Sequence, residues 1–166
     1  MALLAEEIVE EWLNRPGYFT IRGIKMGVQE IDLLAVRWKF DGVVECRHLE
    51  VQASMRPVTY ISRVPKELQL TGRAANSAKA RGSAELKKGV GEWIEKKFYG
   101  EKKVRAMQSL HPGPWSPELV INKVKSEDEV SLIKEHKVKI LRLADIVMGP
   151  GYTEVRNTGG SRCRHH

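Results

Sequence analysis

Two carboxylic acids interrupt apolar segments of the sequence. Asp32 lies in the run Ile-Asp-Leu-Leu-Ala-Val at residues 31–36, and Glu50 lies in His-Leu-Glu-Val-Gln at residues 48–52. Burial of an unpaired carboxylate costs several kcal/mol, so each should be hydrogen-bonded, paired or bound to a metal ion. A single Asp in an apolar strand is more often a structural residue. Two carboxylates in contact, however, could share a divalent ion such as Mg²⁺, which prefers oxygen ligands.

A tight turn between these two segments would make the carboxylates neighbours. The Asp-Gly pair at residues 41–42 is a strong hairpin signal because both residue types accept the positive φ that tight β-turns require. We therefore expect the apolar segment 30–40 and the following segment 43–53 to form antiparallel strands.

The expected hairpin also predicts which side chains face one another. Pairing across the turn would set Asp32 opposite position 51, and a bulge or a shift of one residue would set it opposite Glu50. His48 and Gln52 share the strand parity of Glu50, so their side chains would point the same way.

The remaining elements follow from hydrophobic periodicity and turn residues. Ser83 is a candidate cap for the third helix. Trp12, Trp38 and Trp93 are expected in the core, and Trp115 is expected to anchor a loop. The predicted helices cover Ala2–Asn14, Lys66–Leu70, 84–99, 127–136 and 144–148, and the predicted strands cover 18–24, 30–40, 43–53, 119–124 and 138–143. This order predicts an α/β domain with a mixed sheet between helices.

The segments around the two acids also resemble a known family. Glu-Ile-Asp-Leu-Leu-Ala at 30–35, followed by a hairpin and Leu-Glu-Val-Gln at 49–52, is similar to the core motif of the PD-(D/E)XK nuclease superfamily. The nearest likeness is to small proteins related to Holliday-junction resolvases. In that group a helix ends at Gly-Tyr, matched here by residues 17–18, and carries a glutamate about three turns earlier. The resemblance covers residues 6–53 well.

The resemblance implies a fold, a cofactor and a reaction. The fold would be restriction-endonuclease-like, with a central mixed sheet flanked by helices. Asp32 and Glu50 would bind Mg²⁺ or Mn²⁺ together with the backbone carbonyl of Val51. Glu6 would support the metal or its water from the first helix, a place for which Glu7 and Glu10 compete. The ion would activate water for phosphodiester hydrolysis.

The sequence departs from the family pattern at one position. The family has a lysine two residues after the glutamate, whereas this chain has Gln52. Glutamine can orient a water, but it carries no charge and cannot exchange a proton as lysine can. A lysine from another element could substitute, and Lys87 and Lys88 on the following predicted helix are the candidates.

Basic residues are concentrated in the middle of the chain. The net charge is +7, and residues 56–105 hold 13 Lys/Arg against 5 Asp/Glu, whereas residues 1–55 hold 6 against 9. An acidic segment beside a basic one suits a metal site next to a polyanion, although a solvated basic face is the simpler explanation. The segment 54–84 is expected to be a long basic insert with one short helix. The candidate phosphate contacts are Arg56, Arg63, Lys66, Arg73, Lys79, Arg81, Lys87 and Lys88.

Length and composition favour one domain in a reducing compartment. The 166 residues fit a single domain at 1–148 with a polar, flexible tail at 149–166. The two cysteines do not form a disulfide framework, and no segment reaches the roughly 20 apolar residues of a membrane span. We therefore expect a cytoplasmic protein without a membrane partner.

The leading hypothesis is a metal-dependent endonuclease with DNA as its favoured substrate. A homodimer would suit two-fold substrates such as junctions or palindromes. The alternative is a catalytically impaired nucleic-acid-binding module of the same fold. A protein-interaction domain with no nucleic-acid role is the third possibility.

Overall fold

In a computed structural model of the chain, residues 2–149 are described. The strands are β1 (Phe19–Met26), β2 (Gln29–Trp38), β3 (Val44–Gln52), β4 (Ser116–Ile121) and β5 (Lys139–Arg142). The helices are α1 (Ala2–Asn14), α2 (Lys66–Leu70), α3 (Ser83–Phe98), α4 (Glu101–Leu110), α5 (Glu127–Glu135) and α6 (Leu143–Met148).

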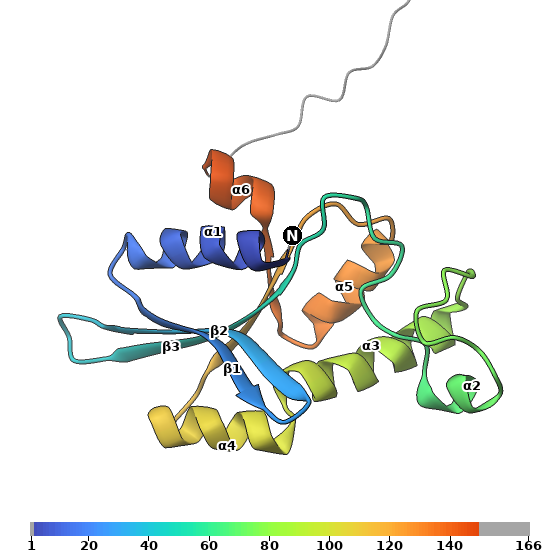
Figure 1. The fold of residues 1–166 in the computed structure, drawn as a ribbon, viewed down its shortest axis with the longest axis horizontal. Coiled ribbons are helices and arrows are strands. Elements are labelled where there is room, and N and C mark those ends of the chain that lie inside the picture. Colours follow the sequence, from blue (N-terminus) through green and yellow to red (C-terminus); the bar gives the residue numbers. More distant parts are fainter. Residues whose placement is uncertain (1, 150–166) are drawn as a thin grey trace, which may run out of the picture.

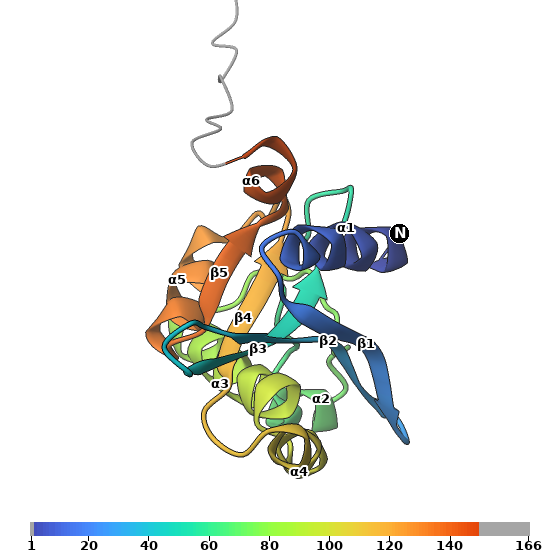
Figure 2. The same ribbon diagram turned by 90° about the vertical axis from the view of Figure 1, so that its left-hand side faces the viewer.

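The strands form one mixed sheet in the order β1-β2-β3-β4-β5. The first three are antiparallel neighbours, and β4 and β5 run parallel to β3. Helices α1 and α6 cover one face, and α3, α4 and α5 cover the other (Figures 1 and 2). The α/β class and the mixed sheet between helices are as predicted.

Alternation along the strands gives the sheet a separate core on each face. Leu119 and Ile121 of β4 pack with Val90 and Ile94 of α3, whereas the intervening Val120 packs against the α1 side. All five side chains are at most 1% exposed. Burial on this scale is the main stabilising contribution to such a domain, at about 25 cal/mol per Å² of apolar surface.

The β2–β3 pairing stops where the two acids lie. It runs from Trp38↔Val44 to Leu33↔Leu49, while β3 continues beside β4 as far as Gln52. The residue numbers of each β2–β3 pair add up to 82, one less than a pairing of Asp32 with position 51 would require. One further step along both strands therefore sets Asp32 opposite Glu50. The sheet therefore forks at these two residues, with the β1–β2 hairpin on one branch and β3 and β4 on the other.

Two sequence predictions about secondary structure were wrong in instructive ways. Helix α4 was not predicted, because its sequence is strongly charged and only Lys103 and Met107 are buried in it. Ser83 does not cap α3: Gly82 is at the N-cap, and no side chain makes a capping hydrogen bond there. The ends of the other elements fall within a few residues of prediction, and α1 and α2 match in full. Of the predicted tail at 149–166, residues 150–166 lie outside the described residues.

The tryptophans divide between core and surface. Trp93 is buried and Trp12 packs against the core, as expected. Trp115 anchors its loop by donating from Nε1 to the carbonyl of His111 at 3.1 Å. Trp38 is 62% exposed and contacts only the edge of Phe19 among the aromatic rings described. The β2–β3 hairpin, on which Trp38 lies, extends past the helical layers (Figure 1).

The insert packs closely against α3 at one glycine, which gives a test of the fold. A Cβ at Gly89 would lie 2.7 Å from the Arg63 carbonyl oxygen, whereas a Cβ at Gly91 would meet nothing within 4 Å. We predict that Gly89→Ala lowers the free energy of unfolding by about 1–3 kcal/mol through overpacking. Gly91→Ala should raise it by about 0.5–1 kcal/mol through helix propensity. Denaturant unfolding followed by circular dichroism measures both, and equal stabilisation would contradict this packing.

Candidate active site

The Asp32 carboxylate lies at the fork and is held by the backbone of the neighbouring strand. The Val51 N–H donates to Asp32 Oδ2 at 2.8 Å. Asp32 is partly buried and lines an open cleft of about 390 Å³ between the β1–β2 hairpin, the insert and α3. The predicted meeting of Asp32 with the end of β3 is confirmed.

Glu50 is fully buried and is surrounded by cationic or protonatable groups. Its Oε1 contacts His48 Nε2 and Lys103 Nζ, each at 2.8 Å, and its Oε2 contacts Lys97 Nζ at 3.3 Å. Lys103 is itself 3% exposed and also donates to the Lys97 carbonyl at 2.8 Å. The buried carboxylate is thus compensated by β3, α3 and α4 together.

The two carboxyl groups have opposite pKa shifts. Burial and the adjacent Glu50 charge raise the pKa of Asp32 to about 7, against the Val51 hydrogen bond and the charge of Lys97. Burial would also raise the pKa of Glu50, but the His48 hydrogen bond and the charges of Lys97 and Lys103 lower it to about 2. One carboxylate is therefore permanently charged while the other titrates near neutral pH. Such divergence is common at functional sites.

Glu6 lies close enough to Glu50 for the charge of Glu50 to affect its pKa. Burial, and then the charge of Glu30, raise the pKa of Glu6, and Glu50 adds to the effect. Helix α1 belongs to the opposite layer of the sheet, and no direct contact between Glu6 and Asp32 or Glu50 is found among the described residues (Figure 1). Its supporting role stays a prediction.

The cleft beside Asp32 is rich in cations. Arg63, Lys66, Lys96, Lys97 and Lys103 line it, against three acids, Glu30, Asp32 and Glu92. When Asp32 is protonated, the excess of positive over negative charge in the lining increases. Such a lining favours an anion over the carboxyl pair.

The lysine of α3 that contacts Glu50 lies on a later turn of the helix than the two predicted candidates. Lys87 is exposed, and exposed Lys88 pairs with Glu67 at 2.6 Å; no contact of either with Asp32 or Glu50 is found among the described residues. Lys97, near the end of the helix, reaches Glu50 instead. Gln52 is half-buried and lines a second cleft together with Lys97.

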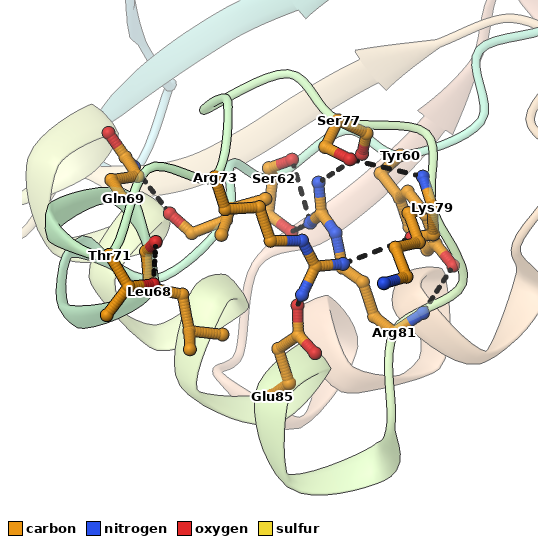
Figure 3. A network of polar contacts seen from close by, with 11 residues as sticks. Tyr60, Ser62, Leu68, Gln69, Thr71, Arg73, Ser77, Lys79, Arg81 and Glu85 are labelled. Carbon is orange, nitrogen blue, oxygen red and sulfur yellow. Dashed lines mark hydrogen bonds and ion pairs between the residues drawn. The ribbon is translucent and has the colours of Figure 1, made fainter.

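Two of the predicted phosphate contacts are structural residues of the insert. Arg73 pairs with Glu85, and it also donates to the Lys79 carbonyl at 3.3 Å. Arg81 stacks on the Tyr60 ring at 4.1 Å and donates to the carbonyl of Ser62 at 3.1 Å (Figure 3). Their guanidinium groups hold the loop closed, and a role of either residue in binding phosphate stays a prediction.

The other candidates divide by position. Arg63 and Lys66 are exposed and line the cleft beside Asp32, which suits the predicted role. Arg56 and Lys79 are also exposed, but they do not line this cleft.

Sequence reasoning missed the two lysines that matter most. Lys97 lies on the predicted helix 84–99 but was not among the candidate site residues, and Lys103 lies in the helix that was not predicted. The hydrophobic pattern of the sequence could not have indicated that either lysine points inward, because lysine is almost never fully buried. His48, by contrast, points toward Glu50 as its strand parity predicted.

Among residues 2–149, no group of three or more His, Cys, Asp or Glu side chains is arranged to hold a metal ion. The donor set available is the Asp32–Glu50 pair. Mg²⁺ commonly uses only one or two carboxylates and completes its shell with waters and substrate phosphates. The pair fits that mode of binding and does not fit a site built from protein ligands alone.

Comparison with known proteins gives little further information. The sequence matches no protein-family model, and no curated protein shows significant similarity. The crystal structure of AF1548, a protein of unknown function, is similar at 16% identity and a TM-score of 0.44. The match covers 85% of this chain and 59% of that one. In the described part of the chain, no helix is long and apolar enough to cross a membrane.

The raised pKa of Asp32 predicts a pH-dependent penalty on stability. The folded protein binds the Asp32 proton more tightly than the unfolded chain, so the free energy of unfolding should fall as pH rises from about 4 through about 7. Asp32→Asn should remove this dependence and stabilise the protein at pH 8 by on the order of 1–3 kcal/mol, allowing for partial solvent screening.

Denaturant unfolding between pH 4 and 8 without divalent ions measures this effect. Asp128→Asn, at an exposed position of α5, is the matched control and should keep the wild-type pH profile. An Asp32→Asn variant with an unchanged profile would contradict the predicted titration.

Proposed function

We propose that the protein is a metal-dependent nuclease that hydrolyses phosphodiester bonds in nucleic acid, with DNA the favoured substrate. The observation that carries the proposal is the pair Asp32–Glu50 at the fork of the sheet, where Asp32 lines a cleft in which lysine and arginine outnumber aspartate and glutamate. The restriction-endonuclease-like fold inferred from the motif is part of the same proposal.

The two oxygens of Glu50 differ in a way that supports ion binding. Oε1 is held by two buried groups, His48 and Lys103, whereas Oε2 contacts Lys97, which is 27% exposed, at the longer distance of 3.3 Å. An ion entering between the carboxylates would displace this longer contact. By the same reasoning the ligand atoms are assigned to Glu50 Oε2 and to Asp32 Oδ1, since Asp32 Oδ2 accepts the Val51 N–H, with the Val51 carbonyl as predicted from the motif.

The chain's own residues have distinct roles in this proposal. A bound Mg²⁺ or Mn²⁺ would supply an activated water and charge stabilisation at the phosphate. Lys103 and His48 hold Glu50 in place. Lys97, released from Oε2, would supply the positive charge that Gln52 lacks and stabilise charge on the phosphate. Arg63 and Lys66 would position the nucleic-acid backbone.

A nucleic-acid-binding module without catalysis is the second candidate. The observation that favours it is the saturation of Glu50 by three donors, which leaves its charge already neutralised without a metal ion. In that case the cleft would still bind phosphates through its basic lining. Salt-sensitive binding without cleavage is the expected behaviour.

The first test is nicking of supercoiled plasmid with Mg²⁺ or Mn²⁺. The wild-type protein should nick it, and Asp32→Asn should lose at least about 100-fold of the rate because a ligand charge is removed. Titration calorimetry with Mn²⁺ should show weaker ion binding by the same variant. Lys102→Gln, an exposed neighbour of Lys103, is the control and should cleave normally.

DNA binding without nicking in either ion would favour the second candidate. Nicking that survives Asp32→Asn would place the chemistry elsewhere or in a contaminant.

A charge-relocation experiment tests the role of Lys97. Lys97→Gln should lower the cleavage rate by about 10²–10⁴-fold, the usual contribution of a positioned charged or proton-transferring group. Adding Gln52→Lys to that variant should restore part of the rate, since position 52 lies on the strand that carries Glu50 and lines the same second cleft as Lys97. Single-turnover rates on one oligonucleotide measure both effects.

Thermal unfolding of each variant separates a catalytic loss from misfolding. A double variant no faster than Lys97→Gln, though equally stable, would contradict the assignment of Lys97.

A further inference from the structure

A second cleft, of about 490 Å³, lies next to the cleft that contains Asp32. Arg63, Trp93 and Lys97 line both clefts, so the two are adjacent at these residues. The rest of the second cleft is formed mainly by the insert, with Gln52 contributed by the end of β3. The cleft therefore begins two residues from Glu50 along the strand.

The lining of this second cleft differs in charge from that of the first. It includes the cations Arg63, Arg81 and Lys97 and the neutral polar residues Tyr60 and Asn76, and among the described residues that line it there is no Asp or Glu. The adjacent Glu129 is buried, and its carboxylate accepts hydrogen bonds from the N–H groups of residues 61 and 62 at 2.7 Å each. The cleft thus offers positive charge and hydrogen-bond donors to an anion.

The polar groups of this cleft are held in position before any ligand binds. Arg81 donates to the Ser62 carbonyl and to the Ser77 carbonyl, and its backbone N–H donates to the Tyr60 hydroxyl at 3.2 Å (Figure 3). Its buried Nε has no hydrogen-bond partner in the described part of the chain. A guanidinium held rigidly in the cleft wall contributes its positive charge to an anion without first having to be ordered.

We propose that the second cleft binds one unpaired nucleotide of the strand whose phosphodiester lies at Asp32 and Glu50. This inference rests on the proposed function. The phosphate of that nucleotide faces Arg63 and Lys97, because the strand must pass from one cleft to the other at the residues that line both. Its sugar and base face Tyr60 and Asn76.

The size of the cleft requires the nucleotide to be unpaired. Its volume lies within the about 300–1,000 Å³ typical of sites for small ligands, which is room for a nucleotide and not for a base pair. A paired base would have to leave the duplex to enter, at a cost of a few kcal/mol, whereas a single-stranded end or flap enters without that cost. Single-stranded and flapped nucleic acids are therefore the preferred substrate class.

Ala78 allows the cleft to be changed without removing a native contact. It is exposed and lines the second cleft but not the first. Ala78→Glu adds a negative charge there, Ala78→Gln adds the same bulk without the charge, and Ala84→Glu adds the charge at an exposed position of α3 outside the cleft.

Titration calorimetry of the full chain with thymidine 5′-monophosphate in EDTA tests binding without the metal. Ala78→Glu should weaken binding by about tenfold, Ala78→Gln by clearly less, and Ala84→Glu not at all. Thymidine and inorganic phosphate should each bind more weakly than the nucleotide. A single-stranded oligonucleotide should displace the nucleotide at lower concentration than its duplex.

Several results would overturn the proposal: no nucleotide binding, equal binding by Ala78→Glu, inorganic phosphate as strong as the nucleotide, or equal competition by duplex. Because this assay contains no divalent ion, its outcome is separate from that of plasmid nicking. Nucleotide binding without nicking would sink the nuclease and keep the second cleft as a nucleotide site. Nicking without nucleotide binding would support the nuclease and overturn the assignment of the second cleft.

Discussion

The buried charge of Glu50 constrains much of the surrounding structure. An ionised carboxylate with no exposed surface is tolerated only when several donors compensate it, and here three elements supply them: His48 on β3, Lys97 on α3 and Lys103 on α4. Lys103 also donates to the Lys97 carbonyl in the last turn of α3, so one ammonium joins the end of one helix to the start of the next. The turn between α3 and α4 at Gly100 must therefore lie beneath the fork of the sheet. Removing any one donor would leave a buried charge partly uncompensated, which links the geometry of the site to the stability of the fold.

The fork itself has a related cause. Where β2 leaves β3, the Val51 N–H would lose a partner, and the Asp32 carboxylate supplies one. The same side chain is thereby placed beside Glu50, in an environment that raises its pKa to about 7. A residue that satisfies the backbone at a break in the sheet thus also becomes the group most responsive to a cation or to pH. Structural and chemical roles coincide at Asp32, so its presence in an apolar strand does not by itself distinguish between them.

Sequence reasoning succeeded where the relevant interactions are local. The Asp-Gly turn and strand alternation were enough to bring Asp32 and Glu50 together, with an error of one residue in the register. It failed where position depends on packing between distant segments. Nothing local in Glu101–Leu110 indicates that Lys103 is buried beneath a strand some fifty residues earlier. Arg73 and Arg81 likewise lie in a basic loop, and nothing local in the sequence indicates that Glu85 and Tyr60 hold their guanidinium groups in place. Charge alone does not indicate which cations also hold a loop.

Lys97 and Lys103 already contact the Glu50 carboxylate, so a divalent ion could bind there only by replacing one of these contacts. Oε1 is held by two groups that are at most 3% exposed, while Oε2 is held by an ammonium that reaches the solvent and lines both clefts. An ion that replaced this ammonium at Oε2 would leave Lys97 close by with its charge unpaired, at the place where a phosphate would lie. The cost of displacing the ion pair is then offset only when an anion is present to accept the lysine. In the proposed site the phosphate and the divalent ion would favour each other's binding: the ion would replace Lys97 at Glu50, and the phosphate would replace Glu50 at Lys97.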